Sequence, residues 1–356
     1  MDNKQQSSIG VRRRRYRRIA LWSMLLMVSL AMLLPLGGYL YVGIQQAGAQ
    51  AVEQTNPRSN MWRTVRDGNA GYTAVSGAES GVLIQNGQNW RQLRNGPIAN
   101  YGGWVLLGVL VAIALFFAIR RSVRIEGGRS GVRIKRWNVF ERTVHWSTAT
   151  LFMILTITGL SMLFGRVVLI PVLGLSGFSA WAELAMALHN YLGPWFGGLV
   201  VVMIVMWMRH NIPNATDFKW FTKGGGIVGR KHPDAGFMNG GEKVWFWFIC
   251  TVGVVVIAGG LVMNFPNWGF SRGEMQLANM VHSVGAMAWI ALWFGHAYIG
   301  TVGTEGALEG MTTGYVDENW AQQHHNLWLD EVKARESGAA RGVARDATTV
   351  VKGSPA

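Results

Sequence analysis

The stretch MVHSVGAMAWIALWFGHAYIG, residues 280–300, decides how this sequence can fold. Its length and apolar composition suit a helix across a bilayer, because a helix rises about 1.5 Å per residue and needs about 20 apolar residues to span the hydrocarbon. The stretch carries His282 and His296, fourteen residues apart. At about 100° per residue, this spacing turns both imidazoles to within about 40° of one face and separates them by about 21 Å along the axis. We therefore predict a transmembrane helix with one imidazole in each leaflet.

The rest of the chain also has the composition of a membrane protein. Of its 356 residues, 50% are hydrophobic and only 15% are charged. We expect an all-α, polytopic integral membrane helix bundle. Six segments are long and apolar enough to cross a bilayer, namely 19–43, 102–120, 143–165, 185–208, 245–264 and 280–302.

The chain is strongly basic, with 33 Lys and Arg against 19 Asp and Glu and a net charge of +14. Such a charge is common in nucleic-acid-binding proteins, but these do not bury apolar stretches of about twenty residues. Cytoplasmic loops of membrane proteins gather Lys and Arg as orientation signals. We therefore expect the lipid bilayer, and not a nucleic acid, as a partner.

An arginine-rich run at 12–18 precedes the first apolar segment and is expected to hold the N-terminus in the cytoplasm. That segment is either a retained signal anchor or a cleaved signal peptide, because Ala47, Ala49 and Ala51 resemble a cleavage site. With either alternative, the segment that follows lies on the outer side of the membrane.

The single cysteine, Cys250, limits the cofactors that the chain can hold. One thiol cannot form an intrachain disulfide, a CxxCH haem attachment, a Cys-ligated iron–sulfur cluster or a Cys-rich zinc site. If this chain handles electrons, it must therefore use a cofactor with other ligands, and the histidines become the candidates.

Four histidines in the predicted spans fall at two depths. His145 lies near the cytoplasmic start of the third span, and His189 lies near the outer start of the fourth. Because the sixth span runs inward, His282 shares the depth of His189 and His296 shares the depth of His145. A low-spin b-type haem needs two axial ligands from opposite sides of its plane and no Cys link. The pattern predicts two b haems, each held by one pair of imidazoles.

A structural role remains an alternative for each of these histidines. An intramembrane histidine also occurs as a hydrogen-bonded packing residue or as a member of a proton relay. Four histidines at matched depths are harder to explain in that way. The remaining histidines, His210, His232, His324 and His325, lie outside the predicted spans and are expected at the interface or in subunit contacts.

The expected organisation is a four-helix dihaem core with one or two additional N-terminal transmembrane helices. The predicted parts are 1–43, a cationic N-terminus with a signal anchor or signal peptide; 44–101, a periplasmic segment; 102–134, an extra transmembrane helix and cytoplasmic linker; 135–332, the four-helix dihaem cytochrome b domain; and 333–356, a disordered tail.

Residues 135–332 resemble the cytochrome b556 (gamma) subunit of membrane-bound formate dehydrogenase, in its long form. The motifs that carry the resemblance are RTVHW around His145, LHNYLGPWFG around His189, RHNIP at 209–213, NGGEKVWFW at 239–247, VHSVGA and HAYIGTVG around His282 and His296, and WAQQHHNLW at 320–328. Short members of that family begin just before the first haem-ligand span, and they have an amide where this chain has Glu242.

The resemblance implies that His145 and His296 hold the haem nearer the cytoplasm, and that His189 and His282 hold the haem nearer the periplasm. It also implies a quinone pocket to which Asn239 and Gly241 contribute together with His296. From the local sequence alone, 239–241 reads as an ordinary turn or helix N-cap before the fifth span.

The resemblance implies an electron-transfer subunit of a formate:quinone oxidoreductase, with no formate-oxidising site on this chain. The implied partners are an iron–sulfur (beta) subunit, a molybdenum- or tungsten-containing catalytic (alpha) subunit and membrane quinone. Electrons are expected to pass from the periplasmic iron–sulfur subunit through two b haems to quinone near the cytoplasmic side of the bacterial inner membrane. The alternatives are a b-type cytochrome subunit of a hydrogenase or thiosulfate-type reductase, or a non-haem transporter or membrane anchor.

Overall fold

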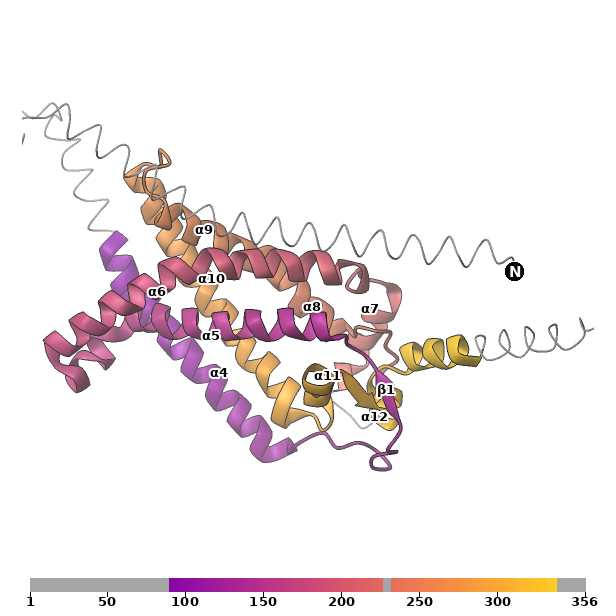
Figure 1. Cartoon of the computed structure of the whole chain (residues 1–356). Coiled ribbons are helices and arrows are strands. Elements are labelled where there is room, and N and C mark those ends of the chain that lie inside the picture. Colours follow the sequence, from indigo (N-terminus) through magenta and orange to yellow (C-terminus); the bar gives the residue numbers. More distant parts are fainter. Residues whose placement is uncertain (1–89, 227–231, 338–356) are drawn as a thin grey trace, which may run out of the picture. The chain divides into compact units, whose positions relative to one another are not determined.

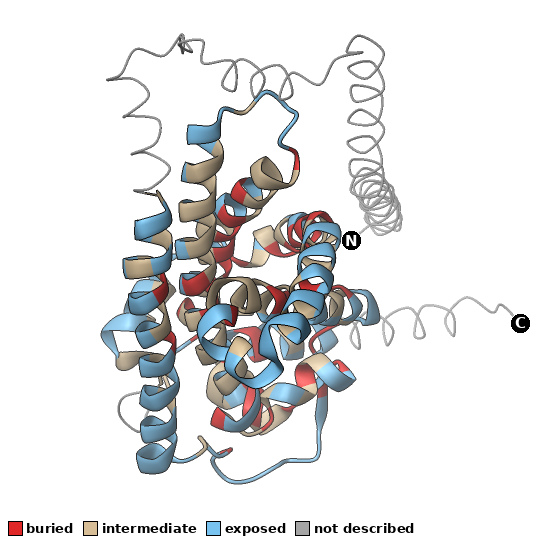
Figure 2. Cartoon of the chain, turned by 90° about the vertical axis from the view of Figure 1, so that its left-hand side faces the viewer, coloured by how far each residue is buried: buried red, intermediate tan, exposed pale blue. Residues whose placement is uncertain are grey.

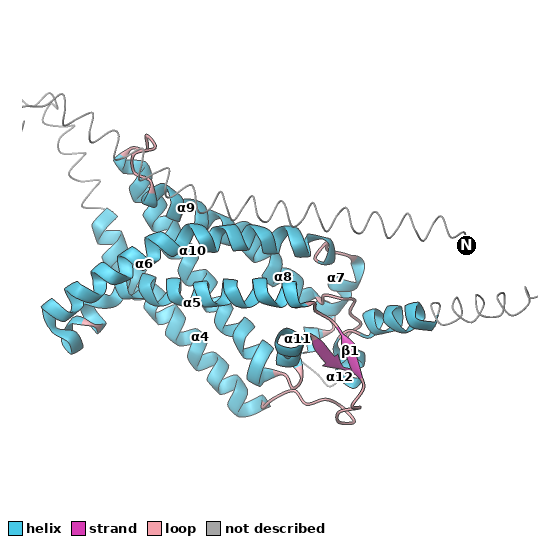
Figure 3. Ribbon diagram, viewed as in Figure 1, coloured by secondary structure: helices cyan, strands magenta, loops and turns pink. Residues whose placement is uncertain are grey.

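The chain folds almost entirely into helices (Figures 1 and 3). The computed structural model describes residues 90–226 and 232–337. The expectation of an all-α, multi-pass membrane bundle is confirmed for this part of the chain, whereas the predicted span at 19–43 lies outside it. Five helical segments are long and apolar enough to cross a membrane, namely Trp90–Arg120, Val139–Val168, Ile170–His210, Gly240–Asn264 and Arg272–Gly303.

Much of the apolar surface points away from the protein interior. Figure 2 shows long exposed and intermediate stretches along the helices, with buried residues in between. In Trp90–Arg120, only 6% of the most apolar window is buried within the chain. A helix that is apolar on all sides and yet exposed is typical of a segment solvated by lipid, since lipid tails are as apolar as its side chains.

The chain divides into two compact units. The described part of unit 1 comprises 90–106, 147–202 and 252–290, and that of unit 2 comprises 107–146, 203–226, 232–251 and 291–337. Several helices contribute residues to both units, among them α4 (Ala99–Arg120), α5 (Val139–Val168) and α10 (Arg272–Tyr298). The helix α6 (Ile170–Trp207) does so as well.

Unit 1 is built from helices alone. Besides its parts of α4, α5, α6 and α10, it contains the π-helix η1 (Arg94–Ile98) and α9 (Val254–Asn264). Phe152, Phe196 and Trp289 form an aromatic core, with ring centroids 5.4 to 6.0 Å apart. The region 166–184, between the third and fourth predicted spans, is mostly helical. Gly174 (φ 70°, ψ 175°) interrupts the helix in a conformation that favours glycine.

Unit 2 combines helix ends with short elements. These are η2 (Met208–His210), α7 (Ala215–Thr222), η3 (Gly224–Gly226), α8 (Gly240–Phe248), the π-helices η4 (Ile249–Gly253, continuing into unit 1) and η5 (Ile299–Gly303), α11 (Ala307–Thr313), α12 (Glu318–His324) and a further helix at 326–337.

Unit 2 also contains a small antiparallel sheet, which the sequence analysis did not anticipate. Strand β1 (Arg133–Lys135) pairs with β2 (Tyr315–Asp317), and Ile134 lies opposite Val316. Both of these side chains are buried in a core cluster with Trp320, Trp328 and Leu329. The sheet therefore joins the segment before α5 to the C-terminal segment.

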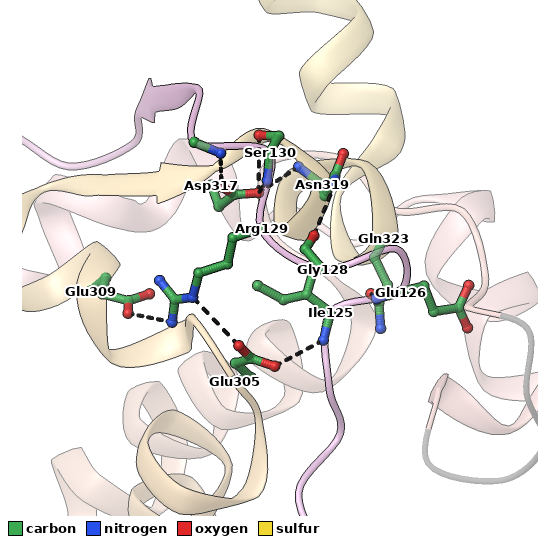
Figure 4. Close-up of polar contacts among 11 residues, drawn as sticks. Ile125, Glu126, Gly128, Arg129, Ser130, Glu305, Glu309, Asp317, Asn319 and Gln323 are labelled. Atoms are coloured by element: carbon green, nitrogen blue, oxygen red, sulfur yellow. Dashed lines mark hydrogen bonds and ion pairs between the residues drawn. The ribbon is translucent and has the colours of Figure 1, made fainter.

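Polar contacts fasten the linker between α4 and β1 to the C-terminal segment (Figure 4). The carboxylate of Asp317 accepts hydrogen bonds from the backbone amides of Ser130, Gly131 and Asn319, at 3.2, 3.0 and 2.9 Å. Arg129 pairs with Glu305 and with Glu309. Asp317 is buried, whereas Arg129 is half exposed, so we expect Asp317 to contribute more to stability.

The C-terminal segment remains helical further than predicted. Residues 333–337, expected to begin a disordered tail, continue the helix at 326–337. The fully buried Leu329 holds this helix, and Lys333 pairs with Glu318 at 2.5 Å. The rest of the predicted tail, 338–356, lies outside the described residues.

Candidate functional site

Unit 1 brings His189 of α6 and His282 of α10 together. Their ring centroids lie 6.0 Å apart, with the ring planes at 78°. The Nδ1 atom of His189 lies 2.9 Å from Thr158 Oγ1, and Nδ1 of His282 lies 2.7 Å from the carbonyl oxygen of Val256. A carbonyl only accepts, so Nδ1 of His282 carries the proton. With Nδ1 engaged on both rings, Nε2 is the nitrogen that can bind a metal.

Glycines allow this close approach. A Cβ atom at Gly159 would lie 3.1 Å from Cε1 of His189, and one at Gly260 would lie 3.2 Å from Cε1 of His282. At Gly259, a Cβ atom would meet the carbonyl oxygen of Ala278 at 3.1 Å. Because glycine has no Cβ, α9 and α10 lie close enough for His282 to reach the Val256 carbonyl.

Unit 2 brings His145 of α5 and His296 of α10 together. Their ring centroids are 6.3 Å apart, with the planes at 52°. Trp245 of α8 stacks on His296, with centroids 4.8 Å apart and the planes at 12°, and Trp146 meets His145 edge-on at 5.2 Å. The Nδ1 atom of His145 is buried and has no hydrogen-bond partner among the described residues.

Both pairs have the separation that bis-imidazole ligation of one iron requires. A metal–imidazole bond is about 2.0–2.1 Å long, and a ring nitrogen lies about 1.2 Å from the ring centroid. Two imidazoles on opposite sides of one iron therefore have centroids about 6.4 Å apart. The observed separations are 6.0 and 6.3 Å.

The surroundings of the rings also fit a large planar group. His145, His189 and His282 are half-buried and His296 is exposed, so each residue keeps some accessible surface beside its partner. The described residues contain no group of three or more His, Cys, Asp or Glu side chains that could hold a free metal ion. Two imidazoles alone are a sufficient protein contribution for haem, whose porphyrin provides the other iron ligands.

Asn239 and Gly241, which the resemblance assigns to a quinone pocket, lie at the start of α8. Asn239 is the N-cap: its side-chain oxygen accepts from the amide of Glu242, and the Glu242 carboxylate accepts from the amide of Asn239. The local interpretation as a helix N-cap is therefore confirmed. A Cβ atom at Gly241 would lie 3.1 Å from the Trp220 ring. The same helix carries Trp245, which contacts His296.

The structure corrects the expectation for His325. This residue is 1% exposed, and its Nδ1 lies 2.8 Å from the carbonyl oxygen of Gly236. It therefore belongs to the interior of unit 2. The neighbouring His324 packs edge-on against His232, with centroids 4.7 Å apart. Burial, assisted by His232 and the nearby guanidinium of Arg136, lowers the pKa of His324 to about 3.

Arg136 occupies an unusual position just before α5. Its side chain is buried between the rings of Phe237, Trp320 and Trp328, each about 5 Å from the guanidinium carbon. It donates to the carbonyl oxygen of Phe237 at 2.8 Å and pairs with Glu242 at 3.2 Å. Burial lowers the pKa of Arg136, and the Glu242 carboxylate opposes that effect. The ion pair links the start of α5 to the start of α8.

Sequence reasoning did not identify three groups that contact the imidazoles. The sequence could have indicated Thr158 as a hydrogen-bonding residue, since it is a hydroxyl in an apolar span next to a glycine. Trp245 lies near the start of the fifth predicted span, and tryptophans at span ends are typical of the membrane interface, so its sequence position did not indicate a contact with His296. The Val256 contact is made by the backbone, so no residue type could have indicated it.

The chain is similar to known membrane cytochromes b. The sequence pattern of the prokaryotic cytochrome b561 family matches residues 136–314. The cytochrome b556(fdo) subunit of formate dehydrogenase from Escherichia coli K12 is 29% identical over 204 residues, which cover 56% of this chain and 93% of that protein. The nitrate-inducible cytochrome b556(Fdn) subunit from the same strain is 25% identical over 210 residues, covering 57% and 94%. A formate dehydrogenase cytochrome b556 subunit from Haemophilus influenzae is 26% identical over 208 residues, covering 56% and 83%.

All four intramembrane histidines lie inside the matched region, at positions 145, 189, 282 and 296. The match covers half of the chain and includes both histidine pairs, so the chain belongs to the prokaryotic cytochrome b561 family.

Proposed function

We propose that this chain is the membrane cytochrome b subunit of a formate dehydrogenase complex in the bacterial inner membrane. It would carry electrons from a periplasmic iron–sulfur subunit through two b haems to quinone near the cytoplasmic side. Membership in a cytochrome b family implies haem b. The relatives named as formate dehydrogenase subunits match this chain over 83 to 94% of their own length, which supports the assignment to such a complex.

The observation that carries the proposal is the presence of two separate imidazole pairs, each at the spacing of bis-histidine ligation. In the proposal, His189 and His282 would hold one haem, and His145 and His296 would hold the other. Haem held in this way supplies one-electron oxidation and reduction without covalent attachment. The protein contributes the ligands, their orientation and an apolar surrounding that excludes water.

The quinone pocket is proposed beside His296, with contributions from Asn239 and Gly241. The helix cap uses only the side-chain oxygen of Asn239, so its amide nitrogen is the atom that would donate to a quinone oxygen. A two-electron reduction of quinone also takes up two protons and therefore needs polar groups that communicate with water. The partly exposed carboxylate of Glu242, at the start of the same helix, is such a group.

The formate-oxidising chemistry is assigned to partner subunits. That reaction needs a molybdenum or tungsten cofactor and iron–sulfur relays, and one cysteine cannot ligate the latter. We therefore propose an iron–sulfur (beta) subunit and a catalytic (alpha) subunit as partners. The alternative complexes, a hydrogenase or a thiosulfate-type reductase, would be recognised by the catalytic chain that copurifies.

Substitution of His282 in the intact complex tests the proposal. We expect His282→Ala to lose one haem and to abolish quinone reduction by formate, while formate oxidation with a soluble dye continues. His232→Ala is the matched control, because His232 packs against His324 and lies in neither imidazole pair. Full formate-to-quinone activity in His282→Ala, or copurification with a hydrogenase in place of a formate dehydrogenase, would overturn the assignment.

A further inference from the structure

We propose that Thr158 is a positioning residue that lowers the midpoint potential of the haem held by His189 and His282, relative to that of the haem held by His145 and His296. The inference rests on the proposed two-haem function. It concerns a side chain that binds neither iron nor quinone and acts through the imidazole of His189.

The direction of the hydrogen bonds at Thr158 follows from its neighbours. The side chain is 1% exposed, and its hydroxyl donates to the carbonyl oxygen of Ile154 at 2.8 Å. The carbonyl oxygen of Leu155 also lies within reach of the hydroxyl, at 3.2 Å. Since both carbonyls can only accept, we infer that the hydroxyl donates to them and that its oxygen accepts from Nδ1 of His189 at 2.9 Å. The result is a chain of two hydrogen bonds that runs from the imidazole to the backbone of α5. It holds His189 in the tautomer that leaves Nε2 unprotonated.

His282 is held in the same manner, by the carbonyl oxygen of Val256 at 2.7 Å. Both imidazoles of unit 1 therefore donate a hydrogen bond from Nδ1 to an oxygen. Such a bond transfers negative charge toward the ring and makes Nε2 a stronger donor to a metal. Stronger donation stabilises ferric over ferrous iron, which lowers the midpoint potential.

The pair in unit 2 lacks at least one of these contacts. Among the described residues, Nδ1 of His145 is buried without a hydrogen-bond partner. An imidazole without this contact is a weaker donor, so the same argument gives the haem of His145 and His296 the higher potential. This order of potentials favours electron flow from the His189 and His282 pair toward the pair beside the proposed quinone pocket.

The test is a redox titration of the two b haems in the purified complex, followed by their optical spectra. Thr158→Val keeps the shape of the side chain and removes the hydroxyl. We expect one midpoint potential to rise in this variant, the other to stay unchanged, and both haems to remain bound. Thr158→Ser keeps the hydroxyl and should restore the potential of the unsubstituted protein.

Thr251→Val is the matched control. Within the described part of the chain, the Thr251 hydroxyl bonds only carbonyls of its own helical segment, at 2.8 Å from the oxygen of Trp247 and 3.3 Å from that of Phe248. This variant should move neither potential. If Thr158→Val loses a haem, Thr158→Ala, which removes the hydroxyl without adding bulk, is titrated by the same criteria. Two haems with unchanged potentials in the variant that lacks the hydroxyl would overturn the inference. Fewer than two haems in the unsubstituted complex would instead refute the proposed function.

Discussion

The indole of Trp245 lies parallel to the imidazole of His296, with their ring centroids 4.8 Å apart and their planes at 12°. One helix, α8, thus begins with the capping pair of Asn239 and Glu242 and, within two turns, covers one face of a proposed haem ligand. The stack restricts rotation of the His296 ring and keeps water from that face. It also gives Trp245 a role that a residue of the membrane interface does not have.

Removal of this stack should weaken one haem site. We expect Trp245→Ala to lower the occupancy of the haem of His145 and His296, since the ligand ring is no longer held in one orientation. Haem content and the reduced-minus-oxidised spectrum measure the loss. Trp268→Ala is the control: it removes a similar stack, on Phe265 at 4.4 Å, that involves no imidazole. An equal loss of haem in both variants would argue against a specific role of Trp245.

Addition of a single methyl group at Gly260, which lies beside His282, should weaken haem binding. In Gly260→Ala, the new Cβ atom would lie 3.2 Å from Cε1 of His282, so the ring must shift by a few tenths of an ångström. We expect reduced haem binding with the helix itself intact. Gly108→Ala meets no atom within 4 Å and should be neutral or gain up to about 1 kcal/mol of stability from helix propensity. Unchanged haem affinity of Gly260→Ala, measured by competition with a haem-binding apoprotein, would contradict the predicted geometry.

Asp317 and Arg129 should differ in their contribution to the stability of unit 2 (Figure 4). Asp317→Ala leaves partly buried backbone amides without their acceptor and removes a helix N-cap, so we expect a loss of about 1–3 kcal/mol. Arg129→Ala removes only exposed ion pairs, and we expect about 0–1 kcal/mol. Thermal unfolding in detergent measures both. Equal effects would show that the hydrogen bonds of Asp317 do not hold the linker.

The stability of unit 2 should fall in mild acid. The pKa of His324 is about 3 in the folded chain, because burial disfavours its charged form, and about 6.5 in the unfolded chain. Between these values the unfolded chain binds a proton that the folded chain does not, so stability decreases as the pH falls from about 6.5 toward 3.

His324→Gln removes this titration, although His232 and His325 remain. We therefore expect the melting temperature to decrease less between pH 7.5 and pH 5 in the variant than in the unsubstituted protein. An identical pH dependence of the two proteins would mean that His324 is accessible to protons in the folded state.

The sequence predicted the features that follow from periodicity and from the rarity of polar groups in hydrocarbon. The five described spans and the partners of each histidine follow from hydropathy and from depth, because a helix converts residue number into position along its axis. The sheet of β1 and β2 could not be predicted, since three-residue strands carry no recognisable pattern and pair across a long sequence separation. The Val256 contact involves only a backbone carbonyl. The helix at 333–337 depends on the burial of Leu329 and on the Lys333 ion pair, which are tertiary contacts.

The most direct test of the central claim is the haem content of the purified chain and of paired histidine substitutions, measured against protein concentration. We predict two b haems per unsubstituted chain and one after each single substitution of His145, His189, His282 or His296 by alanine. The double variant His189→Ala/His282→Ala should still bind one haem, because both changes fall on one site. The double variant His189→Ala/His296→Ala should bind none. Equal haem content in these two double variants, or a chain that binds no haem, would contradict the account.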